Sequence, residues 1–235
     1  MIKKYKLLDE KTEFSGHVLY RIQALQSFGD VKEGDKGGFI EKEENLSHKG
    51  NAWIYENAWV FENAWVYENA KVYGNAKVSG NVLVSENAKV SESALVFGNA
   101  WVYENAKVYG DAEVYGDAKV YGNAKVCGNV LVSGNALVCG NAKVSESAKV
   151  YGNAQVYGGA LIFGNAQVYG NAQVSENAKV SGNAKVCGNA KVSGNAKVYE
   201  CAQVYEDAKV SGNVLVSGNA KVYGIAVILG DWRIL

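Results

Sequence analysis

Few residues of this chain could act as bases, nucleophiles or metal ligands. A histidine is the usual general base near neutral pH, and tetrahedral zinc sites take closely spaced cysteines and histidines. The histidines are His17 and His48, and the cysteines are Cys127, Cys139, Cys187 and Cys201. No cysteine recurs at a metal-ligand spacing, so each predicts a small substituted side chain rather than a site. The many serines fill a repeat, which does not support a Ser-His-Asp arrangement. We predict no catalytic residue, metal or cofactor.

A period of six residues organises most of the chain. From Ile54 to Ile228 every sixth residue is aliphatic, and the consensus unit is Ala-x-Val-(Tyr/Ser)-Gly-Asn. Such a period predicts a solenoid, because a single unit cannot bury its apolar face and must stack on its neighbours. The pattern therefore indicates architecture much more strongly than function.

The unit that begins at Ala58 shows how the repeat is expected to fold. Side chains alternate along a strand, so Ala58 and Val60 point inward and Trp59 points outward. Gly and Asn follow at the corner, where we expect positive φ angles and ladders of stacked amides. Three six-residue sides close a triangle of eighteen residues. The array then makes about ten coils and a prism about 48 Å tall.

The repeat resembles the bacterial transferase hexapeptide repeat, although Gly stands one position later, as in Val78-Ser79-Gly80. The resemblance implies a left-handed parallel β-helix. More narrowly, the N-terminal stretches 29–40 and 45–50 and the Gly-Asn-Ala-x-Val units resemble a prophage-associated YdcK-like group. This resemblance implies a phage or prophage origin and is weakly specific for function.

Acyltransferases of that superfamily use a helix-borne histidine, an extruded loop and a trimer interface, and a related branch binds zinc through three histidines. Here both histidines precede the regular coils, and no insertion breaks the period. A non-catalytic scaffold or binding module is therefore the favoured interpretation. A degenerate acyltransferase that binds acyl-CoA is one alternative, and a phage-encoded protein that sequesters nucleotides or other small molecules is another.

The period predicts three parts of the chain: an N-terminal cap over 1–50, the β-helix over 51–228 and a terminal segment over 229–235. A solenoid needs caps because its end coils expose apolar side chains and unpaired strands. The apolar terminal segment is expected either to fold over the last coil as a lid or to pair with another chain.

Within the cap, two strands are expected at 4–8 and 17–25, with a turn around 10–16. Ile40 and Leu46 are six residues apart but out of phase with Ile54. Irregular first coils are therefore expected before the regular repeat.

Residues eighteen apart lie above one another, which sorts the outward side chains into ladders. One ladder carries an aromatic patch, and its predicted binding residues are Trp65, Tyr67, Leu83, Trp101 and Tyr103. Exposed tryptophans beside tyrosines usually mark a contact surface. The contact is with the folded-back cap, with another subunit or with a ligand.

A second ladder, called face one, begins at Trp53 and continues as a row of lysines. Its predicted binding residues are Lys71, Lys89, Lys107 and Lys125, and Lys143 continues the row. The row is either a cationic strip for an anionic partner or, as we favour, a solvated face that resists strand association. The formal net charge is zero and only Arg21 and Arg233 are arginines, so nucleic acid is not an expected partner.

The remaining expectations concern partners and compartment. No membrane-length apolar run is present, so no membrane association is predicted. Free thiols favour a reducing compartment and hence the cytoplasm. A homo-oligomer is expected as a trimer or an end-to-end dimer, and the protein or small-molecule partner is left open.

Overall fold

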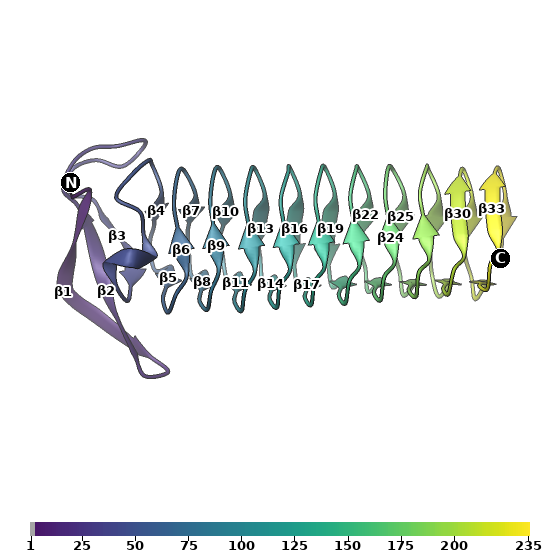
Figure 1. The fold of residues 1–235 in the computed structure, drawn as a ribbon, viewed down its shortest axis with the longest axis horizontal. Helices are drawn as coiled ribbons and strands as arrows, with labels where there is room; N and C mark the ends of the chain where they lie inside the picture. The colour runs from purple at the N-terminus through teal and green to yellow at the C-terminus, as the bar shows by residue number, and fades with distance from the viewer. Residues whose placement is uncertain (1–2) are drawn as a thin grey trace.

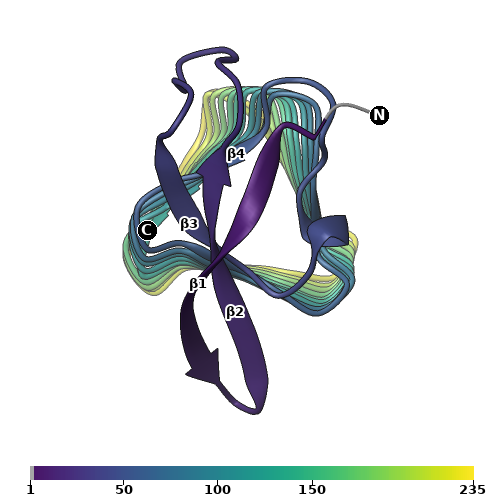
Figure 2. The same ribbon diagram turned by 90° about the vertical axis from the view of Figure 1, so that its left-hand side faces the viewer.

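The repeat folds into stacked coils. The computed structural model describes residues 3–235, and its coils lie along one axis and superpose end-on into a rounded triangular outline (Figures 1 and 2). Both inward positions of each unit are sealed from water, as at Ala124 and Val126, which are 0% exposed. Burial of this continuous column of small and β-branched side chains drives the stacking.

Three sheets form the sides of the prism. The first sheet, which holds face one, has 11 strands: β4 (Trp53–Ile54), β7 (Lys71–Val72), β10 (Lys89–Val90), β13 (Lys107–Tyr109), β16 (Lys125–Gly128), β19 (Lys143–Glu146), β22 (Leu161–Ile162), β25 (Lys179–Val180), β28 (Lys197–Val198), β31 (Leu215–Val216) and β34 (Arg233–Ile234). The second sheet has 13 strands: β1 (Tyr5–Phe14), β2 (His17–Ala24), β3 (Lys36–Ile40), β5 (Trp59–Val60), β8 (Lys77–Val78), β11 (Leu95–Val96), β14 (Glu113–Val114), β17 (Leu131–Val132), β20 (Lys149–Val150), β23 (Gln167–Val168), β26 (Lys185–Val186), β29 (Gln203–Val204) and β32 (Lys221–Val222). The third sheet has 10 strands: β6 (Trp65–Val66), β9 (Leu83–Val84), β12 (Trp101–Val102), β15 (Lys119–Val120), β18 (Leu137–Val138), β21 (Gln155–Val156), β24 (Gln173–Val174), β27 (Lys191–Val192), β30 (Lys209–Gly212) and β33 (Val227–Gly230).

The coil strands pair in parallel and in register, so residues eighteen apart are neighbours. Lys107 pairs with Lys125 and Val108 with Val126, and the Lys107 N–H donates to the Ala124 carbonyl at 2.9 Å. This confirms the predicted all-β parallel solenoid. Within residues 3–235 the single helical turn is the 3-10 helix η1 (Glu43–Asn45). The left hand stays a prediction from the family resemblance.

The corners differ from the sequence prediction in one respect. Positive φ falls on the Gly or Glu that precedes Asn, as at Glu68 (φ 59) and Gly116 (φ 71), so the prediction of positive φ at Asn is wrong. Asn instead builds the expected ladders, because its Nδ2 donates to the Oδ1 of the residue one coil on, as from Asn81 to Asn99 at 2.9 Å. The Asn amide therefore links successive coils by hydrogen bonds, while the preceding Gly or Glu adopts the positive φ of the corner.

The corner glutamates compensate for their strained backbone with a hydrogen bond. The Glu68 Oε2 accepts the Glu86 N–H at 2.7 Å, and the Glu176 Oε2 accepts the Gly194 N–H in the same way. Each of these carboxylates thus satisfies a corner N–H of the next coil, which explains why Glu alternates with Gly at this position.

The N-terminal residues close one end of the solenoid (Figure 2). β1 and β2 form an antiparallel hairpin, β2 pairs antiparallel with β3, and β3 joins the coils by pairing parallel with β5. The predicted turn at 10–16 is wrong. β1 runs to Phe14, and only Ser15 and Gly16 turn, with φ of 48° and 86°. Two residues with positive φ suit the twist of a tight hairpin.

The phase break seen in the sequence has a structural counterpart. Ile40 pairs with Val60 and Leu46 bridges Val66, so the first partners are twenty residues apart instead of eighteen. The two extra residues lie in the segment that leads from η1 into β4. This segment stands beside the regular coils and forms one wall of the cleft described below.

The cap also covers an outward side chain. Trp53 was expected on the open face-one ladder but is 1% exposed, because the Phe28 and Tyr5 rings contact it edge-on at centroid distances of 5.4 and 6.2 Å. Trp59 is half-buried beside Phe14 at 5.2 Å. Trp53 and Trp59 therefore belong to the cap contact.

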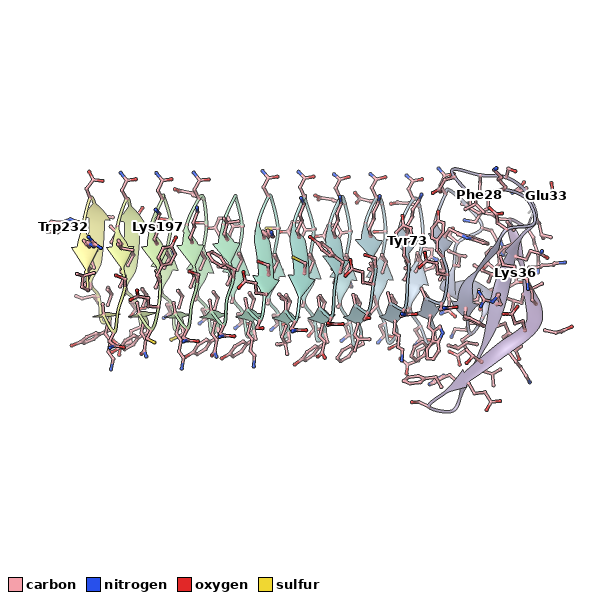
Figure 3. All side chains as sticks on the ribbon, turned by 180° about the vertical axis from the view of Figure 1, so that it is seen from behind. Phe28, Glu33, Lys36, Tyr73, Lys197 and Trp232 are labelled. Atoms are coloured by element: carbon pink, nitrogen blue, oxygen red, sulfur yellow. The ribbon has the colours of Figure 1, made fainter. Side chains whose placement is uncertain are left out.

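The C-terminal segment continues the solenoid. β33 pairs with β30 and β34 pairs with β31, so these residues form a further coil instead of a lid. The prism therefore has about eleven turns, one more than the sequence suggested. Trp232 (Figure 3) is 62% exposed at the end opposite the cap, and Ile225 is 87% exposed. Nowhere in residues 3–235 is a helix long and apolar enough to span a membrane.

Candidate functional site

The predicted aromatic patch lies on the third sheet. Trp65, Leu83 and Trp101 occupy matching positions on β6, β9 and β12. The tryptophans are 43% and 40% exposed, and Leu83 is half-buried. Lys119 follows Trp101 in the ladder, and its ammonium lies 4.5 Å from the Trp101 ring centroid. The three apolar side chains thus make one open strip that the cap does not cover.

The two tyrosines of the predicted site are separated from one another. The next residue in their ladder after Tyr67 is Ser85, which leaves Tyr67 without an aromatic ring one coil on. Tyr67 stacks on Trp65 instead, at 4.2 Å between ring centroids, while Tyr103 stacks on Tyr121 at 4.9 Å. The patch therefore has two ends, and only the Trp65 end lies beside the cap.

A cleft of about 610 Å³ opens at the Trp65 end. One wall is β6 and its corner, with Trp65, Tyr67 and Glu68, and the other wall is the irregular segment 43–50. The lining is mainly apolar and includes Leu46, which is 1% exposed. The sequence prediction missed this second wall. The phase break before Ile54, together with a histidine inside it, was the available signal.

Buried polar contacts fix the second wall. The Asn45 Nδ2 donates to the Ala64 and Glu62 carbonyls at 2.8 and 3.1 Å, which ties η1 to the chain before β6. The Tyr5 hydroxyl lies 2.8 and 2.9 Å from the Leu46 and Glu43 carbonyl oxygens. Burial raises the pKa of Tyr5 above its usual value. The cleft is therefore a preformed feature rather than a loose gap.

His48 stands in this wall with one unsatisfied nitrogen. Its ring stacks on Tyr5 at 4.3 Å, and its Nδ1 accepts the Lys4 N–H at 3.2 Å. The ring proton therefore belongs on Nε2. This Nε2 is shielded from solvent and has no hydrogen-bond partner among residues 3–235, and the nearest carboxylate oxygen, Glu43 Oε2, is 3.6 Å away. A buried donor without a hydrogen-bond acceptor costs free energy unless another group accepts its hydrogen bond.

Carboxylates surround the cleft mouth. The Lys3 ammonium pairs with Glu43 Oε1 at 2.5 Å and, by this hydrogen bond, lowers the pKa of Glu43 below its usual value. Glu44 and Glu68 are exposed, and Lys49 is the one cation among the lining residues. With Glu43 paired to Lys3, Glu44 and Glu68 still outnumber Lys49, so the mouth carries a small negative charge near neutral pH.

The predicted lysines lie along a shallow groove on face one, away from the aromatic cleft. Lys71 pairs with Asp30 of the cap at 2.6 Å, and this contact lowers the pKa of Asp30. Lys89, Lys107 and Lys125 are exposed, and none of them has an ion-pair partner within residues 3–235. The groove has a volume of about 600 Å³, and an asparagine ladder forms its other side.

The remaining chemically capable side chains make structural contacts. The His17 Nδ1 lies 2.8 Å from Glu41 Oε1 inside the cap. Three cysteines follow a tyrosine in the same ladder, as Cys127 follows Tyr109, and hydrogen bonding to Cys127 raises the pKa of Tyr109 to about 12. No group of three or more His, Cys, Asp or Glu suited to hold a metal ion occurs among the described residues.

Comparison with known proteins agrees with this architecture. A family described as the YdcK Beta solenoid repeat matches residues 124–140 and 166–182. The chain is also 36% identical over 63 residues to a protein of Escherichia coli (strain K12) named "Uncharacterized acetyltransferase YdcK". That match covers 23% of this chain and only 19% of the relative's length. The repeats, the partial match and the coils together make this chain similar to YdcK β-solenoid repeat proteins.

Proposed function

We propose that the chain is a non-catalytic β-solenoid binding module whose aromatic patch contacts a partner molecule. The observation that carries this proposal is the open strip of Trp65, Leu83 and Trp101 on a rigid sheet, with both tryptophans at least 40% exposed. Large aromatic side chains left in water beside polar groups usually mark a contact surface. The family resemblance adds a phage or prophage origin to the same proposal.

The unbroken coils support a scaffold role for the rest of the molecule. From β5 to β32 each corner is short and no loop leaves the stack (Figure 1). A surface on such a stack holds its spacing, because each coil is fixed by the one before it. The two histidines contribute to cap contacts, so neither is assigned to proton transfer.

Native mass spectrometry of the purified protein tests the proposal, with the double variant Trp65→Ala/Trp101→Ala as the decisive comparison. We expect the wild type to carry a bound mass or to form a defined oligomer, and the double variant to lose it. Tyr157→Ala is the matched control, because Tyr157 lies on the Tyr67 ladder with 37% exposure but outside the patch. Equal behaviour of all three proteins would show that the patch is not a contact surface.

A second candidate is binding of acyl-CoA or another phosphate-bearing ligand along the lysine groove. The relative's printed name and the unpaired lysines Lys89, Lys107 and Lys125 favour it. Phosphates suit such a row of ammonium groups. Acetyl-CoA or a nucleotide at millimolar concentration should raise the melting temperature of the wild type, but not that of Lys89→Gln/Lys107→Gln. No shift in the wild type would remove this candidate.

A further inference from the structure

We propose that the cleft between β6 and the segment 43–50 binds a neutral, saturated ring that carries several hydroxyl groups, such as a pyranose sugar. This inference rests on the proposed binding function and names the ligand class for the Trp65 end of the patch. Three features of the cleft carry it: an unsatisfied donor, nearby acceptors and an exposed aromatic ring.

The donor is the His48 Nε2–H. Because Nδ1 already accepts the Lys4 N–H, the ring cannot exchange its tautomer without losing that bond. His48 is among the lining residues of the cleft, while its Nε2 is shielded from water, has no hydrogen-bond partner within residues 3–235 and lies 3.6 Å from Glu43 Oε2. A ligand hydroxyl that displaced this carboxylate and reached Nε2 would remove a penalty that the unliganded protein carries.

The acceptors are the carboxylates of Glu43 and Glu68. One oxygen of each is already engaged, since Glu43 Oε1 accepts from Lys3 and Glu68 Oε2 accepts the Glu86 N–H at 2.7 Å. The other oxygens, Glu43 Oε2 and Glu68 Oε1, have no hydrogen-bond donor among residues 3–235. A hydroxyl, unlike a carbonyl or an ammonium group, both accepts a hydrogen bond from His48 and donates one to a carboxylate.

The aromatic ring is the Trp65 indole. Stacking on Tyr67 at an interplanar angle of 20° holds the indole in place, and 43% of the residue is exposed. The C–H groups of a saturated ring lie well against such a surface. The cleft volume of about 610 Å³ is within the range of about 300–1,000 Å³ for small-molecule sites.

Charge argues against the other ligand classes. Glu43 is paired with Lys3, and Glu44 and Glu68 outnumber Lys49 in the lining, so a phosphate or carboxylate ligand is disfavoured. A cation would suit the carboxylates but would leave the His48 donor unmatched. Trp65 and Tyr67 also stack on each other rather than forming two facing walls, so they do not make an aromatic cage for an ammonium group.

The test measures binding of methyl glycosides of glucose, galactose, mannose and N-acetylglucosamine by saturation-transfer NMR and calorimetry. Spermidine and choline serve as cationic probes. His48→Asn removes the Nε2–H but places an amide oxygen where Nδ1 accepts from Lys4, whereas His48→Gln restores a donor near Nε2. Trp65→Ala removes the platform. Trp101→Ala separates the cleft from the rest of the patch, because Trp101 lies in the same ladder but outside the cleft. Tyr157→Ala is the matched control, because it removes an exposed ring outside both the cleft and the patch.

At least one glycoside should bind the wild type. Trp65→Ala and His48→Asn should weaken it by about tenfold or more, with His48→Gln closer to wild type. Trp101→Ala should weaken it less than Trp65→Ala, and Tyr157→Ala should leave it unchanged. Equal loss in Trp65→Ala and Trp101→Ala would overturn the cleft as the site while keeping the patch as a contact surface. Binding of the cationic probes alone, or of no probe, would overturn the ligand class. The proposed function itself fails only in the mass-spectrometry test above.

Discussion

The corner glutamates combine two opposing effects in one residue. A side chain in the left-handed region costs about 1–2 kcal/mol relative to Gly, and Glu176 has a φ of 58°. Its carboxylate also accepts the Gly194 N–H at 2.7 Å, a charge-assisted bond of about 1.5–3 kcal/mol. The two effects nearly cancel, which explains why the repeat uses Glu and Gly interchangeably here.

This balance predicts a difference between two small substitutions. Glu176→Ala keeps the strained backbone and loses the hydrogen bond, whereas Glu176→Gly loses both. We expect the Ala variant to be less stable than the Gly variant by about 1 kcal/mol, which is a melting-temperature difference of about 2–4 °C for a chain of this size.

Thermal unfolding followed by circular dichroism measures this difference. Gly182→Ala is the companion change, because it adds a side chain at φ 68°, where the new Cβ would meet the Glu200 backbone N at 2.8 Å. Gly182→Ala should lower the melting temperature by more than the difference between Glu176→Ala and Glu176→Gly. If the Ala and Gly variants at position 176 melt together, left-handed strain does not govern this position.

At the scale of elements, the cap depends on carboxylates that the coils do not need. Hydrogen bonds from Lys36 and Arg21 lower the pKa of Glu10, Lys71 lowers that of Asp30, and Lys3 lowers that of Glu43. Three of these ion pairs lie within the cap segment, and Asp30–Lys71 joins the cap to face one. The coil core, in contrast, consists mainly of Ala and Val.

Acid should therefore loosen the cap before the coils. A carboxyl whose folded pKa lies below its usual value stabilises the fold above that value, which is 4.5 for Glu, and loses this contribution as the pH falls through the folded pKa. We expect Trp53, buried under Phe28 and Tyr5, to show a red-shifted fluorescence below about pH 4 while the β-sheet circular dichroism persists.

Glu10→Gln is the control for this acid transition. It should give a looser cap at neutral pH and a smaller change on acidification, because one of the titrating groups is gone. A transition in which fluorescence and circular dichroism change together, with the same midpoint in both proteins, would contradict a separately stabilised cap.

At the scale of the whole molecule, the number of coils can change without loss of the fold, but the phase of the six-residue repeat cannot. Each coil contacts mainly its neighbours, and removal of residues 165–182 would delete one full coil and rejoin Gly164 to Asn183 in the same repeat phase. We expect this variant to melt as cooperatively as the wild type. Removal of residues 165–169 should abolish folding of the downstream coils, because it turns the valines outward.

Circular dichroism melts and hydrogen exchange of the downstream coils distinguish these two deletions. The deletion of 165–182 should preserve protection in residues 183–222. A deletion of 165–169 with the same protection would show that the inward valines do not set the coil register.

The sequence was enough to predict the coils, since a single spacing repeats and each Val has the same surroundings. The burial of Trp53 and the presence of the cleft could not be predicted from the sequence. They depend on contacts across the non-repeating segment, such as Lys4 with His48 and Lys3 with Glu43, which join residues about forty apart. No local pattern encodes such packing, and the phase break before Ile54 marks only where it occurs.

The direction of the coil-to-coil hydrogen bonds has a mechanical consequence. These bonds, such as Lys107 N–H to Ala124 carbonyl, run along the long axis of the prism in Figure 1. A force that pulls the two ends apart would load one layer of bonds at a time and peel the chain from an end. Each released coil of eighteen residues would lengthen the molecule by about 60 Å. Stretched in an optical trap, the molecule would extend in near-equal steps, one for each coil that is released.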